Sequence, residues 1–98
     1  MELTYKNKIA LVSGAGRGIG KAIAEALAKG GCTVICVSKN MSSCGKVAEG
    51  INASGGKAEA FAADLSNPSE VKSLCETVLK KYEAVDILVN NAGITKDN

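Results

Sequence analysis

A cluster of glycines near the N-terminus is the segment whose residue types and spacing point most directly to chemistry. Residues 13–20 read Ser-Gly-Ala-Gly-Arg-Gly-Ile-Gly and lie between an apolar run and a stretch of helical apolar spacing. Where such a loop opens a helix, backbone N–H groups and the positive end of the helix dipole converge, and together they favour an anion. Glycines there permit positive φ and let a ligand approach the backbone closely. We therefore predict that this glycine loop binds a phosphate or pyrophosphate.

Counting positions separates three kinds of glycine loop. A P-loop ending at Lys21 would have Ala15 in place of its first glycine and Ala22 in place of its metal-binding hydroxyl. The G-x-G-x-x-G spacing fails as well, because a count from either possible start ends on Ile19 or Lys21. The spacing that fits, counted from the first glycine of the loop, is Gly-x-x-x-Gly-x-Gly.

The elements that must position this loop follow from the apolar pattern, which predicts a β-α-β-α-β-α-β order. Short apolar runs predict buried strands over residues 9–12, 33–37, 58–63 and 85–89. Helical spacing predicts helices from residue 19 to a stop at 30–31, over 43–53, and from 68 to 79. Asn67 is expected to cap the third helix, with Pro68 in its first turn and Glu70 reaching back to the cap. Such alternation requires parallel pairing and right-handed crossovers, so the expected fold class is α/β, a doubly wound parallel sheet with strand order 3-2-1-4.

Three segments together resemble the short-chain dehydrogenase/reductase family. The glycine loop matches the family's Thr-Gly-x-x-x-Gly-x-Gly element, with Ser13 in place of the threonine. Asp64 follows the third predicted strand, where the family has an acidic residue beside the adenine ring. Residues 90–93 match the Asn-Asn-Ala-Gly element, and Asp86 opens the strand before it. The resemblance implies that residues 1–98 are the N-terminal part of a single NAD(P)-binding Rossmann domain.

The end of the second predicted strand indicates which dinucleotide this resemblance implies. An NAD site has a carboxylate there for the ribose hydroxyls, whereas an NADP site has cations. The chain has Ser38 and Lys39 at this point, no carboxylate from residue 26 to 48, and a second cation, Arg17, in the glycine loop. We therefore expect NADP(H); the alternative is that both cations are solvated surface charges. The cofactor-binding residues implied by the resemblance are Ser13, Gly14, Arg17, Gly18, Ile19, Gly20, Ser38, Lys39, Asp64, Leu65, Asn90, Ala92 and Gly93.

No catalytic residue is predicted within the 98 residues. The chain has no histidine, and the family reduces carbonyls with a Tyr-x-x-x-Lys pair that is missing here, since Tyr5 is followed four residues later by Ile9 and Tyr82 by Asp86. Residues 8–20 and 90–98 together look like the 3-oxoacyl-acyl-carrier-protein reductase branch of the family, with Lys96 in place of an arginine. The resemblance implies an NADPH-dependent reductase of fatty-acid synthesis, acting on an acyl-carrier-protein thioester, of which this chain is the cofactor-binding half and inactive alone.

Two alternatives to this function stay open. One is another short-chain dehydrogenase/reductase that acts on a different carbonyl or alcohol. The other is a catalytically silent NADP-binding module that is complete at 98 residues. A Tyr-x-x-x-Lys pair further along the chain would favour an enzyme, and a natural stop at Asn98 would favour the module.

Charge and composition exclude several other classes. Twelve basic and ten acidic residues leave a formal charge of +2, so we expect no nucleic-acid partner. No apolar run approaches the roughly 20 residues of a membrane span, and the N-terminus lacks a signal peptide, so we expect a cytoplasmic protein without a membrane partner. The resemblance implies a homo-oligomer at full length. The cysteines form no C-x-x-C pair and no metal site, and we expect buried free thiols at Cys32, Cys36, Cys44 and Cys75.

Overall fold

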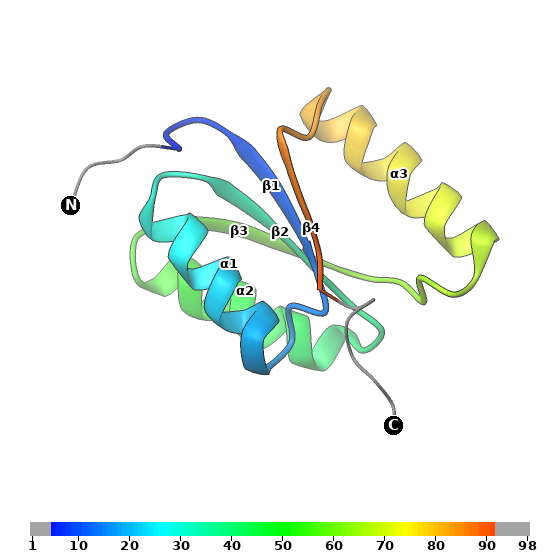
Figure 1. Cartoon of the computed structure of the whole chain (residues 1–98), viewed down its shortest axis with the longest axis horizontal. Coiled ribbons are helices and arrows are strands. Elements are labelled where there is room, and N and C mark those ends of the chain that lie inside the picture. Colours follow the sequence, from blue (N-terminus) through cyan, green and yellow to red (C-terminus); the bar gives the residue numbers. More distant parts are fainter. Residues whose placement is uncertain (1–4, 92–98) are drawn as a thin grey trace.

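The computed structural model describes residues 5–91, which form a four-stranded parallel sheet with helices on both faces (Figure 1). The elements in chain order are β1 (Ile9–Ser13), α1 (Gly18–Lys29), β2 (Thr33–Ser38), α2 (Met41–Ala53), β3 (Lys57–Ala62), α3 (Pro68–Tyr82) and β4 (Ile87–Asn90). The strand order is β3-β2-β1-β4, and every pair is parallel. The predicted α/β fold class and the order 3-2-1-4 are therefore confirmed.

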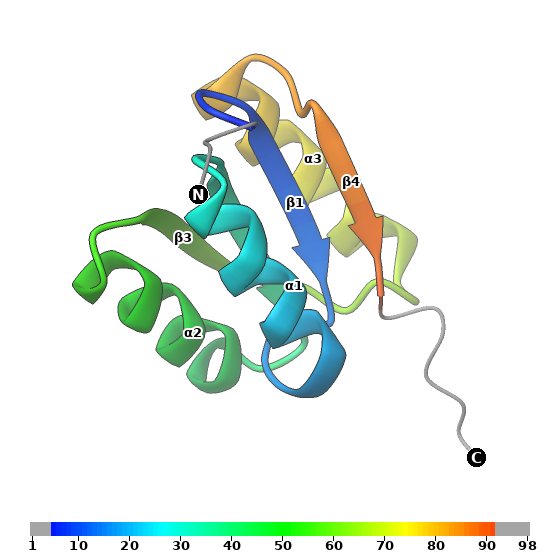
Figure 2. The same ribbon diagram turned by 60° about the vertical axis from the view of Figure 1, so that its left-hand side comes forward.

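Two apolar cores hold the layers together, one on each face of the sheet. Figure 2 shows α1 and α2 covering the same face and α3 lying behind the strands. Side chains alternate between the faces along each strand, so Val12 and Cys36 pack toward α1 and α2 while Ile35 and Val37 pack toward α3. The central strands are buried on both faces, which explains why they read as continuous apolar runs.

Several boundaries differ from the prediction by one to three residues, and α3 ends at Tyr82 rather than at residue 79. The second helix begins at Met41 rather than at residue 43. The fourth strand runs from Ile87 to Asn90 rather than over 85–89. Before it, the N–H of Asp86 donates to the C=O of Ile9 at 2.8 Å, and the Asp86 carboxylate accepts the N–H of Ile9 at 2.8 Å. The side chain of Asp86 thus takes the place of one backbone hydrogen bond between β1 and β4. Regular strand pairing starts one residue after Asp86.

The start of α3 is capped as predicted, with one difference. The side-chain oxygen of Asn67 accepts the N–H groups of Ser69 at 3.0 Å and Glu70 at 3.3 Å. The Glu70 carboxylate does not return to the cap but accepts the N–H of Asp64 at 2.8 Å. The N–H of Asn67 is already used, since it donates to the C=O of Asp64 at 3.0 Å.

The prediction of buried thiols is correct for three cysteines and wrong for Cys75. Cys32, Cys36 and Cys44 are buried free thiols, whereas Cys75 is exposed. Of the described positions of α3, only Leu74 and Val78 are buried, so the buried part of this helix is narrower than its apolar face. Burial raises the pKa of Cys36 to about 11, and the neighbouring Cys44 thiol adds to this shift.

The described part of the chain contains neither a membrane-spanning helix nor a group of metal-binding side chains. None of its helices has the length and apolar character to cross a bilayer. Its Cys, Asp and Glu side chains form no group of three or more that could hold a metal ion.

Candidate nucleotide-binding site

The carboxyl ends of the strands meet at one edge of the sheet, and the predicted site residues lie on turns that leave this edge. In-register pairing places Ser13 of β1 beside Val37 of β2 and Asn90 of β4. The chain leaves β1, β2 and β3 at this edge into the turns that carry the glycine loop, Lys39 and Asp64. In open parallel sheets, ligands bind outside these ends at the point where the strand order reverses, which here lies between β1 and β4.

The glycine loop makes a tight turn onto the first helix. Gly14 has φ 64° and Gly18 has φ 60°, values in the left-handed region that favours glycine. The N–H of Ala15 donates to the C=O of Val37 at 3.1 Å and ties the loop to the end of β2. A Cβ on Gly20 would lie 1.9 Å from the C=O oxygen of Gly14, so the first turn of α1 packs directly on the loop backbone.

The first turn of α1 is open to an anion. Arg17 is the N-cap residue, and within residues 5–91 no side chain caps the helix. The first turn has no acidic residue, a Cβ on Gly18 would meet no described atom within 4 Å, and Ile19 is 65% exposed. Uncapped donors, open space and the helix dipole together fit a diphosphate group.

The fourth strand supports the glycine loop from the other side. The buried Ser13 hydroxyl lies 3.2 Å from the C=O of Val89 and 3.3 Å from Oδ1 of Asn90. The Nδ2 of Asn91 donates to the C=O of Gly14 at 3.2 Å. Asn91 was not among the predicted site residues, although its place beside Asn90 in one asparagine pair was an available signal.

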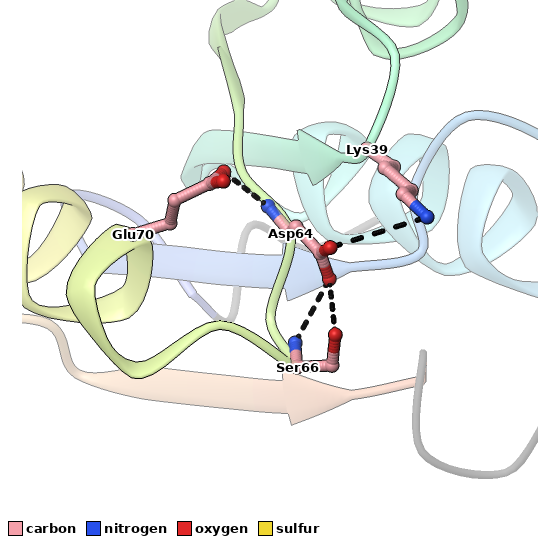
Figure 3. Close-up of polar contacts among 4 residues, drawn as sticks. All are labelled: Lys39, Asp64, Ser66 and Glu70. Atoms are coloured by element: carbon pink, nitrogen blue, oxygen red, sulfur yellow. Dashed lines mark hydrogen bonds and ion pairs between the residues drawn. The ribbon is translucent and has the colours of Figure 1, made fainter.

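Lys39 and Asp64, which were predicted from separate segments, meet across the ends of β2 and β3 (Figure 3). The Nζ of Lys39 is 4.0 Å from Oδ2 of Asp64, and the two side chains are 77% and 32% exposed. The other carboxylate oxygen, Oδ1, accepts the hydroxyl of Ser66 at 2.6 Å and its N–H at 3.0 Å. These bonds from Ser66, followed by the charge of Lys39, hold the pKa of Asp64 below its ordinary value, so the carboxylate is ionised at neutral pH.

Two serines that sequence reasoning missed hold these turns. Ser66 fixes the Asp64 carboxylate, and the Ser43 hydroxyl donates to the C=O of Asn40 at 3.0 Å. The hydroxyl of Ser38 lies 3.1 Å from that of Ser43 and donates to the same C=O at 2.7 Å. Serine shortly after Asp or Asn commonly bonds within such turns, so the signal was present in the sequence.

A cleft of about 680 Å³ joins these turns to the face of the sheet that carries α3. Its apolar walls include Leu11, Val37, Leu65 and Leu74, and apolar walls of this kind fit a planar ring system. The predicted residues that line the cleft are Ser13, Gly14, Ser38, Lys39, Asp64, Leu65 and Asn90.

The other predicted residues lie elsewhere. Those on the glycine loop and the first turn of α1 are Arg17, Gly18, Ile19 and Gly20. Ala92 and Gly93 lie outside the described residues.

A strand, glycine loop and helix at the carboxyl edge of a parallel sheet ordered 3-2-1-4 define the Rossmann fold. Comparison with known proteins narrows the class further. The sequence model of the short chain dehydrogenase family matches residues 8–98, and the chain belongs to this family.

Curated relatives share their N-terminal part with the chain. The 3-oxoacyl-[acyl-carrier-protein] reductase FabG of Escherichia coli K12 is 40% identical over 96 residues, which are 98% of this chain and 38% of the relative. The 3-oxoacyl-[acyl-carrier-protein] reductase of Synechocystis is 46% identical over 91 residues, which are 92% of this chain and 37% of the relative. The chain therefore spans less than half the length of these relatives.

Solved structures of the family superimpose closely. A metagenomic short-chain oxidoreductase in complex with NADP has a TM-score of 0.89 and 37% identity, over 93% of this chain and 41% of its own. A hydroxysteroid dehydrogenase from Escherichia coli has a TM-score of 0.86 and 36% identity, over 90% of this chain and 37% of its own.

Proposed function

We propose that the chain is the NADP(H)-binding part of a short-chain reductase and forms the N-terminal part of one Rossmann domain. The observation that carries this proposal is the charge at the end of β2, where Lys39 extends over the cleft and no carboxylate follows the strand before residue 49. Arg17 at the start of α1 is a second cation. The solved relative in complex with NADP supports the choice of cofactor.

Each part of the candidate site has a proposed role in binding the cofactor. The glycine loop and the first turn of α1 hold the diphosphate, using Ser13, Gly14, Gly18, Ile19 and Gly20. Arg17, Ser38 and Lys39 bind the 2′-phosphate end of the adenosine ribose, and Asp64 and Leu65 flank the adenine. Asn90 is assigned to the second ribose, and Ala92 and Gly93 are assigned to the cofactor by the family resemblance alone. When bound, NADPH supplies a hydride, and the residues of this chain bind and orient it.

The proposed substrate of the whole protein is a 3-oxoacyl thioester on acyl-carrier protein, in fatty-acid synthesis, and the proposed assembly is a homo-oligomer. The names of the relatives from Escherichia coli and Synechocystis support this substrate. A second candidate is a reductase of another carbonyl, which the similar hydroxysteroid dehydrogenase favours.

The cofactor proposal is tested by calorimetry on the intact protein with 2′-phospho-ADP-ribose and ADP-ribose. Charge-assisted contacts to a phosphate are strong, and 1.4 kcal/mol corresponds to tenfold, so Arg17→Ala and Lys39→Ala are each expected to reduce the preference for the phosphorylated ligand roughly tenfold. The control Lys80→Ala removes an exposed cation from α3 and should leave the preference unchanged. An unchanged preference in both site variants would refute NADP(H) as the cofactor.

The substrate proposal is tested by following NADPH oxidation by the intact protein. A 3-oxoacyl thioester on acyl-carrier protein is expected to be reduced faster than a 3-oxosteroid. The reverse order would identify the second candidate. Cofactor binding without turnover of either compound would contradict the proposed substrate and leave a reductase of a third carbonyl or a silent binding module.

A further inference from the structure

We propose that Asp64 tunes the preference for the phosphorylated cofactor, because its carboxylate is the partner that Lys39 keeps when no 2′-phosphate is bound. This inference rests on the proposed NADP(H) site. It gives Asp64 a specificity-determining role in addition to its proposed place beside the adenine.

The Asp64 carboxylate is held in place by the turn around it. Its Oδ1 accepts both donors of Ser66, at 2.6 Å and 3.0 Å, and its backbone N–H donates to the Glu70 carboxylate at 2.8 Å (Figure 3). The second oxygen, Oδ2, is directed toward Lys39. The carboxylate is therefore a fixed charge with one oxygen presented to the end of β2.

Lys39 is the movable member of the pair. Its side chain is 77% exposed, and the contact at 4.0 Å is at the outer limit of an ion pair. Exposed pairs of this kind are weak and exchange readily, and the lysine side chain is long and flexible. The ammonium can leave Asp64 for a phosphate without any movement of the backbone.

Such an exchange of partners by Lys39 affects the binding of the two cofactor forms differently. A ligand without the 2′-phosphate leaves Lys39 paired with Asp64, so the cation is not left without a partner. A phosphorylated ligand gains Lys39 only by breaking that pair, which reduces its advantage. In residues 5–91 the other ion pair joins Lys81 to Glu59, and no second carboxylate lies within ion-pair distance of Lys39.

The experiment measures the ratio of dissociation constants for ADP-ribose and 2′-phospho-ADP-ribose by calorimetry on the intact protein. Asp64→Asn removes the charge and retains an oxygen for the Ser66 donors. The ratio is expected to rise about two- to fivefold, the range of an exposed ion pair. Any change in adenine binding affects both ligands and cancels in the ratio. The matched control Glu76→Gln removes one charge from the exposed surface of α3 and should leave the ratio unchanged.

A double-mutant cycle tests whether Asp64 acts through Lys39. In a Lys39→Ala background, Asp64→Asn is expected to leave the ratio unchanged. An equal rise in that background would show direct repulsion of the phosphate and overturn the proposal. So would an unchanged ratio in Asp64→Asn alone while Lys39→Ala still lowers it, and that result would leave the NADP(H) site intact.

Ligand binding by the wild-type protein and the fold of each variant must also be measured. A wild-type protein that binds neither ligand refutes the proposed function and this inference together. Circular dichroism checks the fold of each variant, and Asp64→Ser, which also retains an oxygen in the turn, replaces Asp64→Asn if that variant does not fold. The same rise in the ratio is expected for it.

Discussion

Gly20 and Gly50 are both helical glycines, but their surroundings differ completely. A Cβ on Gly20 would lie 1.9 Å from the C=O oxygen of Gly14 and 2.7 Å from Nδ2 of Asn91. A Cβ on Gly50, in α2, would meet no described atom within 4 Å. Packing requires a glycine at position 20, whereas Gly50 has no such contact and only lowers the stability of α2.

This contrast gives a prediction for unfolding in urea. Gly20→Ala forces the first turn of α1 away from the glycine loop and is expected to lower the free energy of unfolding by about 1–3 kcal/mol or more. The matched variant Gly50→Ala adds the same methyl group in open space and is expected to raise it by about 0.5–1 kcal/mol. Equal unfolding midpoints for the two variants would contradict the packing described at Gly20.

At the scale of the elements, α3 is fastened to β3 by a small polar cluster at its C-terminal end. The hydroxyl of Tyr82 donates to the Glu59 carboxylate, and Nζ of Lys81 lies 2.7 Å from the same oxygen. The bonds from Lys81 and then Tyr82 lower the pKa of Glu59. Burial, together with the bond to Glu59, raises the pKa of Tyr82 to about 12.

These pKa shifts predict how stability depends on pH. The lowered pKa of Glu59 stabilises the fold above its ordinary value of 4.5, and this contribution is lost as pH falls through the lowered pKa. The raised pKa of Tyr82 stabilises the fold below 10.0, and this contribution is lost as pH rises toward about 12. Urea midpoints measured across pH should show both losses.

Two variants assign the losses to this cluster. Glu59→Gln is expected to reduce the acid loss. Tyr82→Phe is expected to reduce the alkaline loss and to lower the free energy of unfolding at neutral pH by about 1 kcal/mol. An unchanged pH profile in both variants would place the titrating groups elsewhere.

The sequence was sufficient for the order of the elements and insufficient for the contacts between their turns. Helical apolar spacing predicted the helices and continuous apolar runs predicted the strands, because burial against or within the sheet requires these patterns. The helical apolar spacing of α3 predicted too many buried positions, since it included the exposed Cys75. Lys39 and Glu70 contact Asp64 only because the turns after β2 and β3 and the start of α3 lie close together. Apolar spacing in the sequence carries no information about these positions.

At the scale of the whole molecule, β4 is an edge strand of the described sheet and is paired with β1 on one side. Leu88 in its middle is 70% exposed. Unpaired strand edges with apolar side chains promote association between chains. This edge is the most exposed apolar part of the sheet.

A polypeptide of these 98 residues, expressed by itself, is therefore expected to self-associate. Sedimentation velocity should show a sedimentation coefficient that rises with concentration. Leu88→Lys is expected to shift the polypeptide toward the monomer, because charged side chains protect strand edges. Met41→Lys, at a 50% exposed apolar position on α2, is the control and should leave association unchanged. Equal association in both variants would show that the edge is not responsible.

The hydrogen bond between the Asn91 side chain and the C=O of Gly14 joins positions 77 residues apart. A ribosome delivers the first of these positions before the second, because synthesis runs from the N-terminus. During that interval the nascent glycine turn lacks its amide donor. This hydrogen bond can form only after the ninety-first residue has emerged from the exit tunnel.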